Sequence, residues 1–133
     1  MGEGNIDTGP CVFCALPANR LVQSNATAIA IRDAYPVSPG HSLIIPKRHI
    51  GSFFEVSSVE RADLMALLAS MRALLNAELN PEAYNIGIND GPQAGQTVPH
   101  MHMHLIPRFV GDVADPRGGV RWILPAKAKY WRD

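Results

Sequence analysis

The chain has 133 residues, of which 47% are hydrophobic, and its twelve basic side chains balance twelve acidic ones to a formal charge of zero. This length and apolar content predict a single domain over residues 1–133 with one core. The even charge argues against nucleic acid or an anionic membrane as a partner, because both favour a basic surface. The sequence has no apolar run of about 18 residues and no secretion signal, so we expect a cytoplasmic protein.

The sequence of the N-terminal third of the chain predicts a polar segment followed by two strands. Residues 1–10 are polar and glycine-rich, which indicates a flexible arm ahead of the sequence Cys-Val-Phe-Cys at 11–14. Residues 26–32 and 42–45 mix β-branched and other apolar residues, so each is expected to form a short strand. The proline- and glycine-rich residues 35–41 between them predict a turn, and this tight connection favours antiparallel pairing.

One long helix is expected in the middle of the chain. Ser57 and Glu60 have the spacing of a capping box, which predicts that the helix begins near Ser57. Leucine and methionine recur at helical spacing up to about Leu79, where Asn80-Pro81 ends the pattern. The apolar stripe of this helix must therefore lie on a sheet or on another helix.

The C-terminal half adds two strands and an extension. Residues 84–89 and 100–107 are expected to be strands, separated by a glycine-rich loop at 90–95. The composition changes after this point, and residues 111–133 form a C-terminal extension in which 120–125 is a candidate edge strand. The expected fold class is α+β, with an antiparallel sheet of about five strands, one long helix and a short helix.

Histidine and methionine alternate over residues 100–104, so the three imidazoles should share one face of their strand. Three interpretations of that face are open. The histidines are structural, or they bind a catalytic metal together with another ligand and a water. In the third interpretation a neutral imidazole attacks phosphorus while a second group accepts charge or supplies a proton.

The loop that precedes the histidines favours attack on phosphorus. The glycines within 89–98 let backbone N–H groups approach a phosphate closely. Asn89 and Gln96 add neutral hydrogen-bond donors. The loop and the histidine strand together therefore predict a phosphate-binding site.

The run Gly-Gln-Thr-Val-Pro-His-Met-His-Met-His-Leu-Ile at 95–106 resembles the signature of the histidine triad (HIT) nucleotide-binding family. The resemblance covers most of residues 11–108. It includes residues 33–41 after a sheet strand, the next strand with its Pro-Lys-x-His exit at 43–49, and the Asn-x-Gly loop at 89–95.

The resemblance implies specific roles for the histidines. The middle one, His102, would be the nucleophile that takes the nucleoside monophosphoryl group, and His104 would contact the phosphate and the leaving group. The backbone around His100 and His102 would fix the tautomer of the nucleophile. The implied substrate-binding positions are Asp33 for the sugar hydroxyls, Asn89 and Gln96 for phosphate oxygens, and Thr97 beside them.

Cys11 and Cys14 are too close in sequence to staple a fold, and in a reducing cytosol such a pair favours a metal or redox role. Some branches of the resembled family combine this pair with a histidine at the strand exit and the first histidine of the triad, which here are His49 and His100. This Cys₂His₂ set suits a structural zinc ion with no open position, which would leave His102 free for chemistry. Two idle thiols are the alternative.

The family contains phosphoramidases, dinucleoside polyphosphate hydrolases and transferases. His104 argues against the transferases, which usually carry glutamine there, and Gln96 resembles the hydrolases, including the fragile histidine triad branch. The resemblance therefore implies hydrolysis of a dinucleoside polyphosphate, with adenosine as the expected base. A nucleoside phosphoramidase, or a nucleotide-binding regulatory module with incidental turnover, is the alternative.

Two further expectations concern assembly and the surroundings of the site. The family is typically dimeric through a continued sheet, so we expect a homodimer, with Trp122 and Trp131 as candidate contacts. His41, in the Pro-Gly-His turn, is expected to be a structural residue that is hydrogen-bonded near the site.

Overall fold

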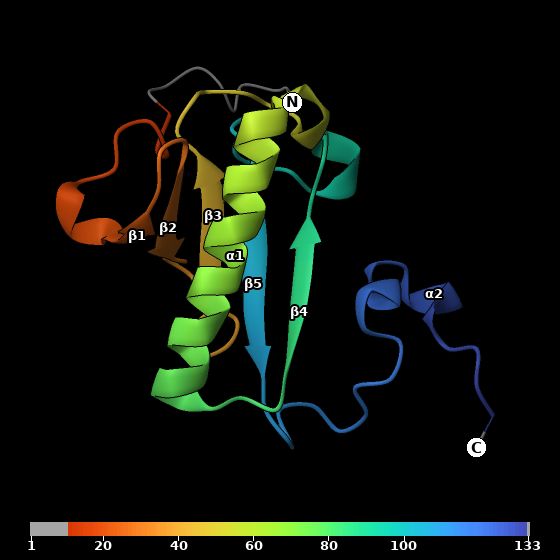
Figure 1. Cartoon of the computed structure of the whole chain (residues 1–133). Coiled ribbons are helices and arrows are strands. Elements are labelled where there is room, and N and C mark those ends of the chain that lie inside the picture. The colour runs from red at the N-terminus through yellow and green to blue at the C-terminus, as the bar shows by residue number, and fades with distance from the viewer. Residues whose placement is uncertain (1–10, 133) are drawn as a thin grey trace.

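One antiparallel sheet with a long helix across one face organises the chain in the computed structural model, which describes residues 11–132 (Figure 1). The spatial strand order is β1-β2-β3-β5-β4, and every neighbouring pair is antiparallel. The α+β fold class is confirmed, whereas the arm expected over 1–10 lies outside the described residues. The strands are β1 (Leu21–Ser24), β2 (Ala28–Arg32), β3 (Ser42–Pro46), β4 (Ala83–Ile88) and β5 (Met103–Arg108).

Helix α1 (Ser58–Leu79) confirms the prediction from the capping box. Ser57 is the N-cap, and its side chain and that of Glu60 satisfy each other's backbone N–H groups. The helix ends at Asn80, which adopts a left-handed conformation (φ 49°) before Pro81. Its buried stripe packs on the sheet and forms the main core with residues from β2, β3 and β5; from the helix these are Leu64, Leu67, Met71 and Leu75.

The histidine strand is shorter than predicted, because β5 begins at Met103 and the first two histidines precede it. Strand β3 ends at Pro46, and its ladder with β5 extends only as far as the pair Ile44–Met103. The chain before β5 is held instead by the Met101 N–H, which donates to the Ile50 carbonyl at 2.7 Å. The alternation survives outside the ladder, since the methionines and Leu105 still face the core under α1.

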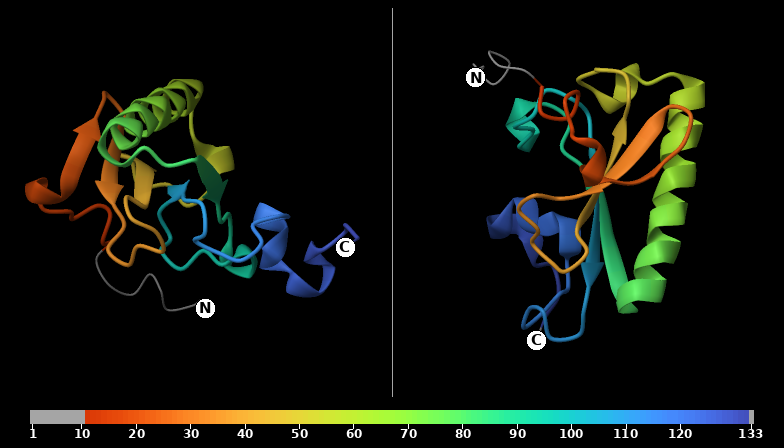
Figure 2. Two further views of the ribbon diagram at one scale, coloured as in Figure 1. Left: turned by 90° about the horizontal axis from the view of Figure 1, so that it is seen from below. Right: turned by 90° about the vertical axis from the view of Figure 1, so that its left-hand side faces the viewer.

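The C-terminal arm, residues 109–132, corrects the prediction of an edge strand at 120–125. Gly118 and Gly119 both have positive φ (97° and 49°), and they turn the chain into a 3₁₀ helix and a short α-helix. Figure 2 shows this arm on the sheet face opposite α1. The remaining helical elements are η1 (Ala18–Arg20), η2 (Phe53–Glu55), η3 (Pro92–Ala94), η4 (Gly119–Ile123) and α2 (Pro125–Ala128).

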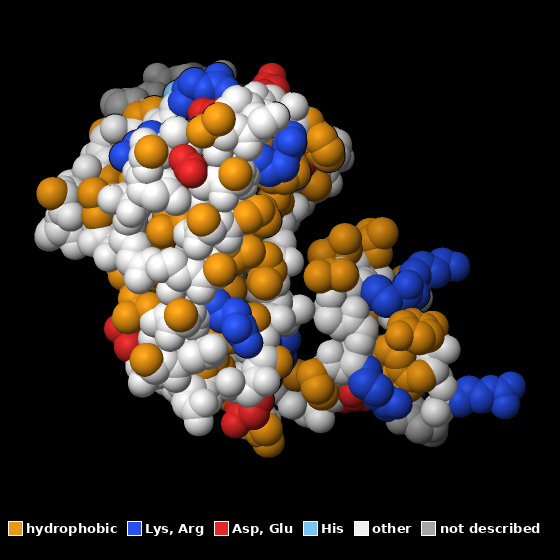
Figure 3. All heavy atoms as spheres, in the orientation of Figure 1, with side chains coloured by type: hydrophobic (Ala, Val, Ile, Leu, Met, Phe, Trp, Pro, Cys, Tyr) orange, Lys and Arg blue, Asp and Glu red, His pale blue; other side chains and the backbone are white. Residues whose placement is uncertain are grey.

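Local contacts hold the arm in this shape. The Trp122 indole N–H donates to the Arg117 carbonyl at 2.8 Å, and the Arg121 guanidinium donates to the Ala128 carbonyl at 2.9 Å. Arg121 also lies over the ring of Tyr130, 4.7 Å from its centroid. In the space-filling view the arm is a separate lobe with apolar and basic side chains on its surface (Figure 3).

Candidate active site

The three histidines lie in a row on the sheet face opposite α1. His100 is fully buried and His102 is 8% exposed. The rings of His102 and His104 are close neighbours, with their centroids 5.3 Å apart. The alternation along residues 100–104 therefore brings together the two histidines for which the resemblance implies a catalytic role.

The tautomer of His102 follows from one hydrogen bond. Its Nδ1 lies 2.9 Å from the backbone carbonyl oxygen of His100. A carbonyl oxygen can only accept, so Nδ1 carries the proton and Nε2 of the neutral ring has a free lone pair. Nε2 is the nitrogen that a nucleophilic histidine would use.

His104 takes the opposite arrangement, because of a chain of hydrogen bonds that starts at Val37. The Val37 N–H donates to His41 Nδ1 at 3.2 Å, so the proton of neutral His41 sits on Nε2. His41 Nε2 then donates to His104 Nδ1 at 2.9 Å, with Asp33 Oδ2 also near it at 3.4 Å. His104 must therefore carry its proton on Nε2, as a donor.

His41 and His104, which are joined by this series of hydrogen bonds, are neutral at physiological pH. Burial lowers the pKa of His104 to about 4, and the neighbouring His102 and His41 add to the effect, whereas Asp33 opposes it. Burial also lowers the pKa of His41, again against the influence of Asp33. Asp33, His41 and His104 lie close enough to hold a metal ion, but the hydrogen bonds already account for their arrangement.

Gln96 holds the glycine-rich loop in shape. Its Oε1 accepts from the Gly91 N–H at 2.8 Å, and its Nε2 donates to the carbonyls of Gly51 and Val98 at 2.9 and 3.0 Å. Both amide hydrogens are used within the protein, so Gln96 offers no donor to a phosphate here. This differs from the phosphate contact that the resemblance implies.

The other polar residues of the loop divide into structural and accessible ones. Asp90 accepts from the Phe53 N–H at 2.8 Å and from the Ser52 hydroxyl at 3.0 Å, which fixes the loop to η2. Asn89 and Thr97 are exposed, and Asn89 lies in a cavity with His104. The side chains accessible to a phosphate are therefore those of Asn89 and Thr97.

The two cysteines, His49 and His100 converge on one point, as the sequence predicts. The Cys11 and Cys14 sulfurs lie 3.4 and 3.5 Å from His100 Nδ1, and Cys14 Sγ lies 3.2 Å from His49 Nδ1. The two Nδ1 atoms are 3.2 Å apart. Ligands around a tetrahedral zinc ion are separated by roughly 3.3–3.8 Å, so this donor set fits the metal without rearrangement.

The outer contacts of this cluster also suit a metal site. His100 Nε2 donates to the Pro46 carbonyl at 2.8 Å, which leaves Nδ1 free to bind a metal. Phe13, between the cysteines, packs edge-on against His102 with centroids 5.0 Å apart. This contact was not expected from the sequence, in which an aromatic residue between two cysteines gives no signal for it.

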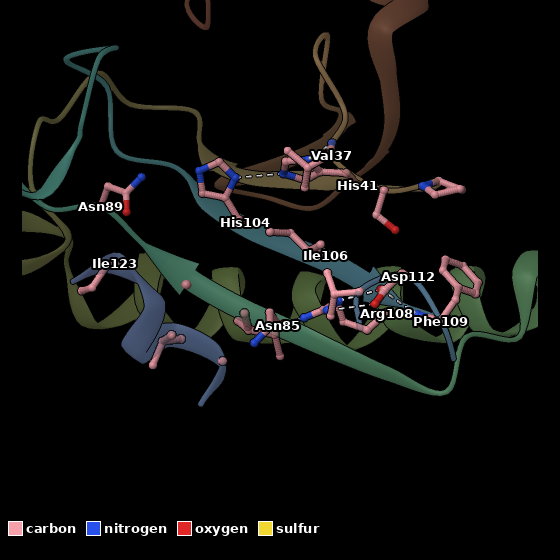
Figure 4. Close-up of a pocket in the computed structure, with 17 residues that line it drawn as sticks. Val37, His41, Asn85, Asn89, His104, Ile106, Arg108, Phe109, Asp112 and Ile123 are labelled. Carbon is pink, nitrogen blue, oxygen red and sulfur yellow. Dashed lines mark hydrogen bonds and ion pairs between the residues drawn. The ribbon is translucent and has the colours of Figure 1, made fainter. Parts of the chain in front are cut away.

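A cavity of about 620 Å³ lies beside His104 (Figure 4). It is bounded by β4 and β5, by the turn at Val37–Pro39 and by the C-terminal arm. His102 does not line it, whereas His104 and Asn89 do. Gly87, directly across the ladder from His104, also lines the cavity, and a glycine inside a strand is a sequence signal for close approach of a ligand.

Residues 17–111 match the family model of the HIT domain. The chain belongs to the HIT family. It is 33% identical over 117 residues to the nitrilase and fragile histidine triad fusion protein NitFhit of Caenorhabditis elegans, covering 86% of this chain but only 27% of that longer protein. It is 39% identical over 80 residues to the asymmetrical bis(5′-nucleosyl)-tetraphosphatase of Schizosaccharomyces pombe, covering 60% of this chain and 44% of that enzyme.

Solved structures support the same family. A zinc-bound histidine triad protein from Mycobacterium smegmatis superposes with a TM-score of 0.68 and 32% identity, covering 92% of this chain and 82% of that one. The family expected from the triad is therefore confirmed, and its members include hydrolases of nucleotides. Within residues 11–132, none of the helices combines the length and apolar character that a membrane span needs.

Proposed function

We propose that the protein hydrolyses dinucleoside polyphosphates at the α-phosphorus through a phosphohistidine on His102. The observation that carries the proposal is the pair of opposite tautomers in adjacent rings. His102 has a free lone pair on Nε2, whereas His104 carries a proton on Nε2. One nitrogen is thus ready to attack, and the other is ready to donate a hydrogen bond to the oxygen where charge develops.

The reaction has two displacements. Nε2 of His102 forms a bond to the α-phosphorus as the bond from that phosphorus to the bridging oxygen breaks, and the leaving nucleotide departs with the electron pair. The His100 carbonyl, which accepts from Nδ1–H, stabilises the positive charge that the ring acquires. Water then attacks the phosphorus, the P–N electron pair returns to Nε2, and a nucleoside monophosphate and a proton are released.

The substrate contacts are assigned to residues around this pair. Asn89 and Thr97 would bind phosphate oxygens beside His104, and Gln96 would support them by holding the loop. Asp33 would accept from the ribose hydroxyls of an adenosine nucleotide, an assignment supported by its position next to His41. The S. pombe tetraphosphatase supports a dinucleoside polyphosphate as substrate.

Zinc is proposed at Cys11, Cys14, His49 and His100, supported by the donor distances and the zinc-bound relative. When bound, it would supply a cross-link between the N-terminal loop and the histidine row, with no position left open for substrate. The free cysteines suit a reducing cytoplasm. A homodimer is also proposed, through the edge of β4, where Ile86 is 46% exposed.

The function is tested by comparing kcat/KM for diadenosine tetraphosphate, adenosine 5′-phosphoramidate and a sugar nucleotide. We expect the first to be the best substrate, and hydrolysis in ¹⁸O-water to put the label on AMP, because water attacks the α-phosphorus. His102→Asn should abolish turnover and leave nucleotide affinity within a few-fold of wild type. Negligible turnover of all three substrates with retained affinity would instead favour a nucleotide-binding regulatory module.

A further inference from the structure

Cys11 and Cys14 lie at the two ends of a tight turn at the surface. The Cys14 N–H donates to the Cys11 carbonyl at 3.2 Å, and the two sulfurs lie within 4.8 Å of each other. The Cα atoms at the ends of such a turn are less than about 7 Å apart, and a disulfide needs roughly 4.4–6.8 Å. Cys14 is exposed and Cys11 is half-buried. The pair can therefore close into a disulfide without unfolding the turn, and Cys14 is accessible to an oxidant.

Phe13 connects this turn to the proposed nucleophile. Its ring packs edge-on against His102, with centroids 5.0 Å apart, and lies 5.9 Å from the ring of His100. The first described residues lie on the sheet face opposite α1 (Figure 2). There Phe13 packs against a second, smaller core, which consists of Ile31, Leu43 and Ile45. A change in the turn is therefore felt directly at the ring of His102.

His100 is the second connection between the sulfurs and the nucleophile. Its Nδ1 lies 3.4 and 3.5 Å from the two sulfurs, and its backbone carbonyl accepts from His102 Nδ1 at 2.9 Å. His100 is fully buried, so its ring cannot turn to water for a new partner. A disulfide has no S–H to donate, which would leave the exposed His49, 3.2 Å away, beside Nδ1. Because an unpaired buried acceptor is unfavourable, oxidation of the sulfurs should displace His100 and its carbonyl.

We propose that a peroxide converts Cys11 and Cys14 into a reversible disulfide, which releases zinc from the cluster and slows turnover at His102. This inference rests on the proposed function and on the proposed zinc site. Thiolates are the form of cysteine that binds a metal, so a disulfide removes two of the four ligands. The modification site is thus the cysteine pair, and the change at His102 is its consequence.

The oxidation balances with peroxide as the oxidant. The Cys14 thiolate attacks one peroxide oxygen, the O–O bond breaks, and a sulfenic acid forms as hydroxide leaves. The Cys11 thiolate then attacks the Cys14 sulfur, the S–S bond forms, and the S–O bond breaks to release a second hydroxide. The two sulfurs lose two electrons, and two protons from solvent convert the hydroxides into water. A dithiol reverses the reaction by thiol–disulfide exchange.

The surroundings favour oxidation at the cysteines over the methionines of the histidine row. Met101 and Met103 are 1% and 2% exposed, so peroxide in solvent does not reach their sulfurs. Disulfides that are exposed are the ones that cellular thiols reduce easily, and cytosolic disulfides are usually transient. The pair therefore suits a modification that is made and removed in a reducing compartment.

The test treats reduced, zinc-loaded wild-type protein with equimolar hydrogen peroxide. We expect mass spectrometry to show the loss of the two thiol hydrogens and a chromogenic chelator to detect one released zinc ion per chain at the same rate. The kcat for diadenosine tetraphosphate should fall roughly 5–12-fold, which is the effect of losing one neutral hydrogen bond. Dithiothreitol with added zinc should restore kcat, whereas it would not reverse oxidation of methionine.

Cys14→His is the matched control, because it replaces the exposed thiol with another zinc ligand and leaves Cys11 without a partner thiol. Peroxide should leave its zinc content and its kcat equal to those of the untreated variant. An equal fall of kcat in Cys14→His and wild type would overturn the inference, since the fall would then arise elsewhere. If Cys14→His binds no zinc, the mass and the zinc release of wild type still decide.

The ¹⁵N chemical shifts of the His102 ring separate this inference from the proposed function. The reduced protein should carry the proton on Nδ1, and the oxidised protein should show a mixture of tautomers, whether or not any substrate is turned over. A disulfide that leaves zinc bound, or one that changes neither these shifts nor kcat, would overturn the inference and leave the proposed function intact. Reduced protein that holds no zinc would overturn it together with the metal site.

Discussion

His41 should control catalysis without touching the substrate, because it fixes the tautomer of His104. The His41 Nε2–H donates to His104 Nδ1 at 2.9 Å; His41 is buried and His104 is half-buried. Without this donor, nothing obliges His104 to keep its proton on Nε2, the nitrogen expected to face the leaving group. His41→Met removes the donor and keeps an apolar side chain of similar length. His41→Gln has nearly the same shape and provides an amide N–H.

The size of the effect follows from the single hydrogen bond that is lost. A hydrogen bond between neutral groups contributes about 1–1.5 kcal/mol, which corresponds to a fall in kcat of roughly 5–12-fold. We expect this fall in His41→Met with a smaller change in KM, and a partial recovery of kcat in His41→Gln. The pKa of His104, about 4 in the wild type, keeps its ring neutral in the assay at pH 7.

The decisive measurement is the ¹⁵N chemical shift of the His104 ring, which reports the protonated nitrogen directly. Wild type and His41→Gln should carry the proton on Nε2, and His41→Met should show a mixture of tautomers. Thermal unfolding of each variant controls for loss of structure. The reasoning fails if His41→Met retains wild-type kcat, or if kcat falls in both variants while the tautomer remains the same.

Three other substitutions test the surroundings of the site. Cys14→Ser should abolish stoichiometric zinc in elemental analysis and lower Tm by about 5 °C or more, whereas unchanged zinc content contradicts the ligand set. Glu60→Gln should lower the unfolding free energy by on the order of 2 kcal/mol at pH 7, because Arg48 is the main cause that lowers the pKa of Glu60 from 4.5 to about 2. Because its folded-state pKa is lowered, ionised Glu60 stabilises the folded protein fully above pH 4.5 and progressively less as the pH falls toward 2. The loss of unfolding free energy in Glu60→Gln, measured by urea titration, should therefore be smaller by about half at pH 3 than at pH 7. A loss that does not depend on pH contradicts this assignment. Gln96→Glu should lower the unfolding free energy of the ligand-free protein by about 1–3 kcal/mol and speed hydrogen exchange at the Gly91 N–H. An effect on nucleotide affinity alone would instead show that Gln96 contacts the substrate.

The elements that the sequence predicts well are those with local signals. Helix α1 has its capping box at Ser57 and its stop at Asn80-Pro81, so both ends are within a residue or two of the prediction. Strand β1 was not predicted, because it has four residues and an irregular register between Leu21 and Gln23 that removes any clear alternation. The strand predicted at 120–125 is wrong for a similar reason, because its β-branched residues follow Gly118 and Gly119, which set a helical turn.

Residue types at the site could be predicted, but their partners could not. The sequence marks Gln96 as a polar residue near phosphate, yet its hydrogen bonds depend on Gly51, which is 45 residues away. His41 was expected to be structural, and only the packing of the turn against β5 brings its ring to His104. The cavity depends in the same way on the path of the C-terminal arm, for which residues 109–119 carry no periodic pattern.

His100 explains why the first histidine of the triad is not interchangeable with the second. Nδ1 of its ring faces the sulfurs of Cys11 and Cys14, and Nε2 donates to the Pro46 carbonyl, so both nitrogens have partners within the protein. Its backbone carbonyl holds the proton on Nδ1 of His102. Fixing the ring of His100 therefore also fixes the oxygen that orients the proposed nucleophile, and a metal bound by the two cysteines, His49 and His100 would act on catalysis through the main chain without contacting the substrate.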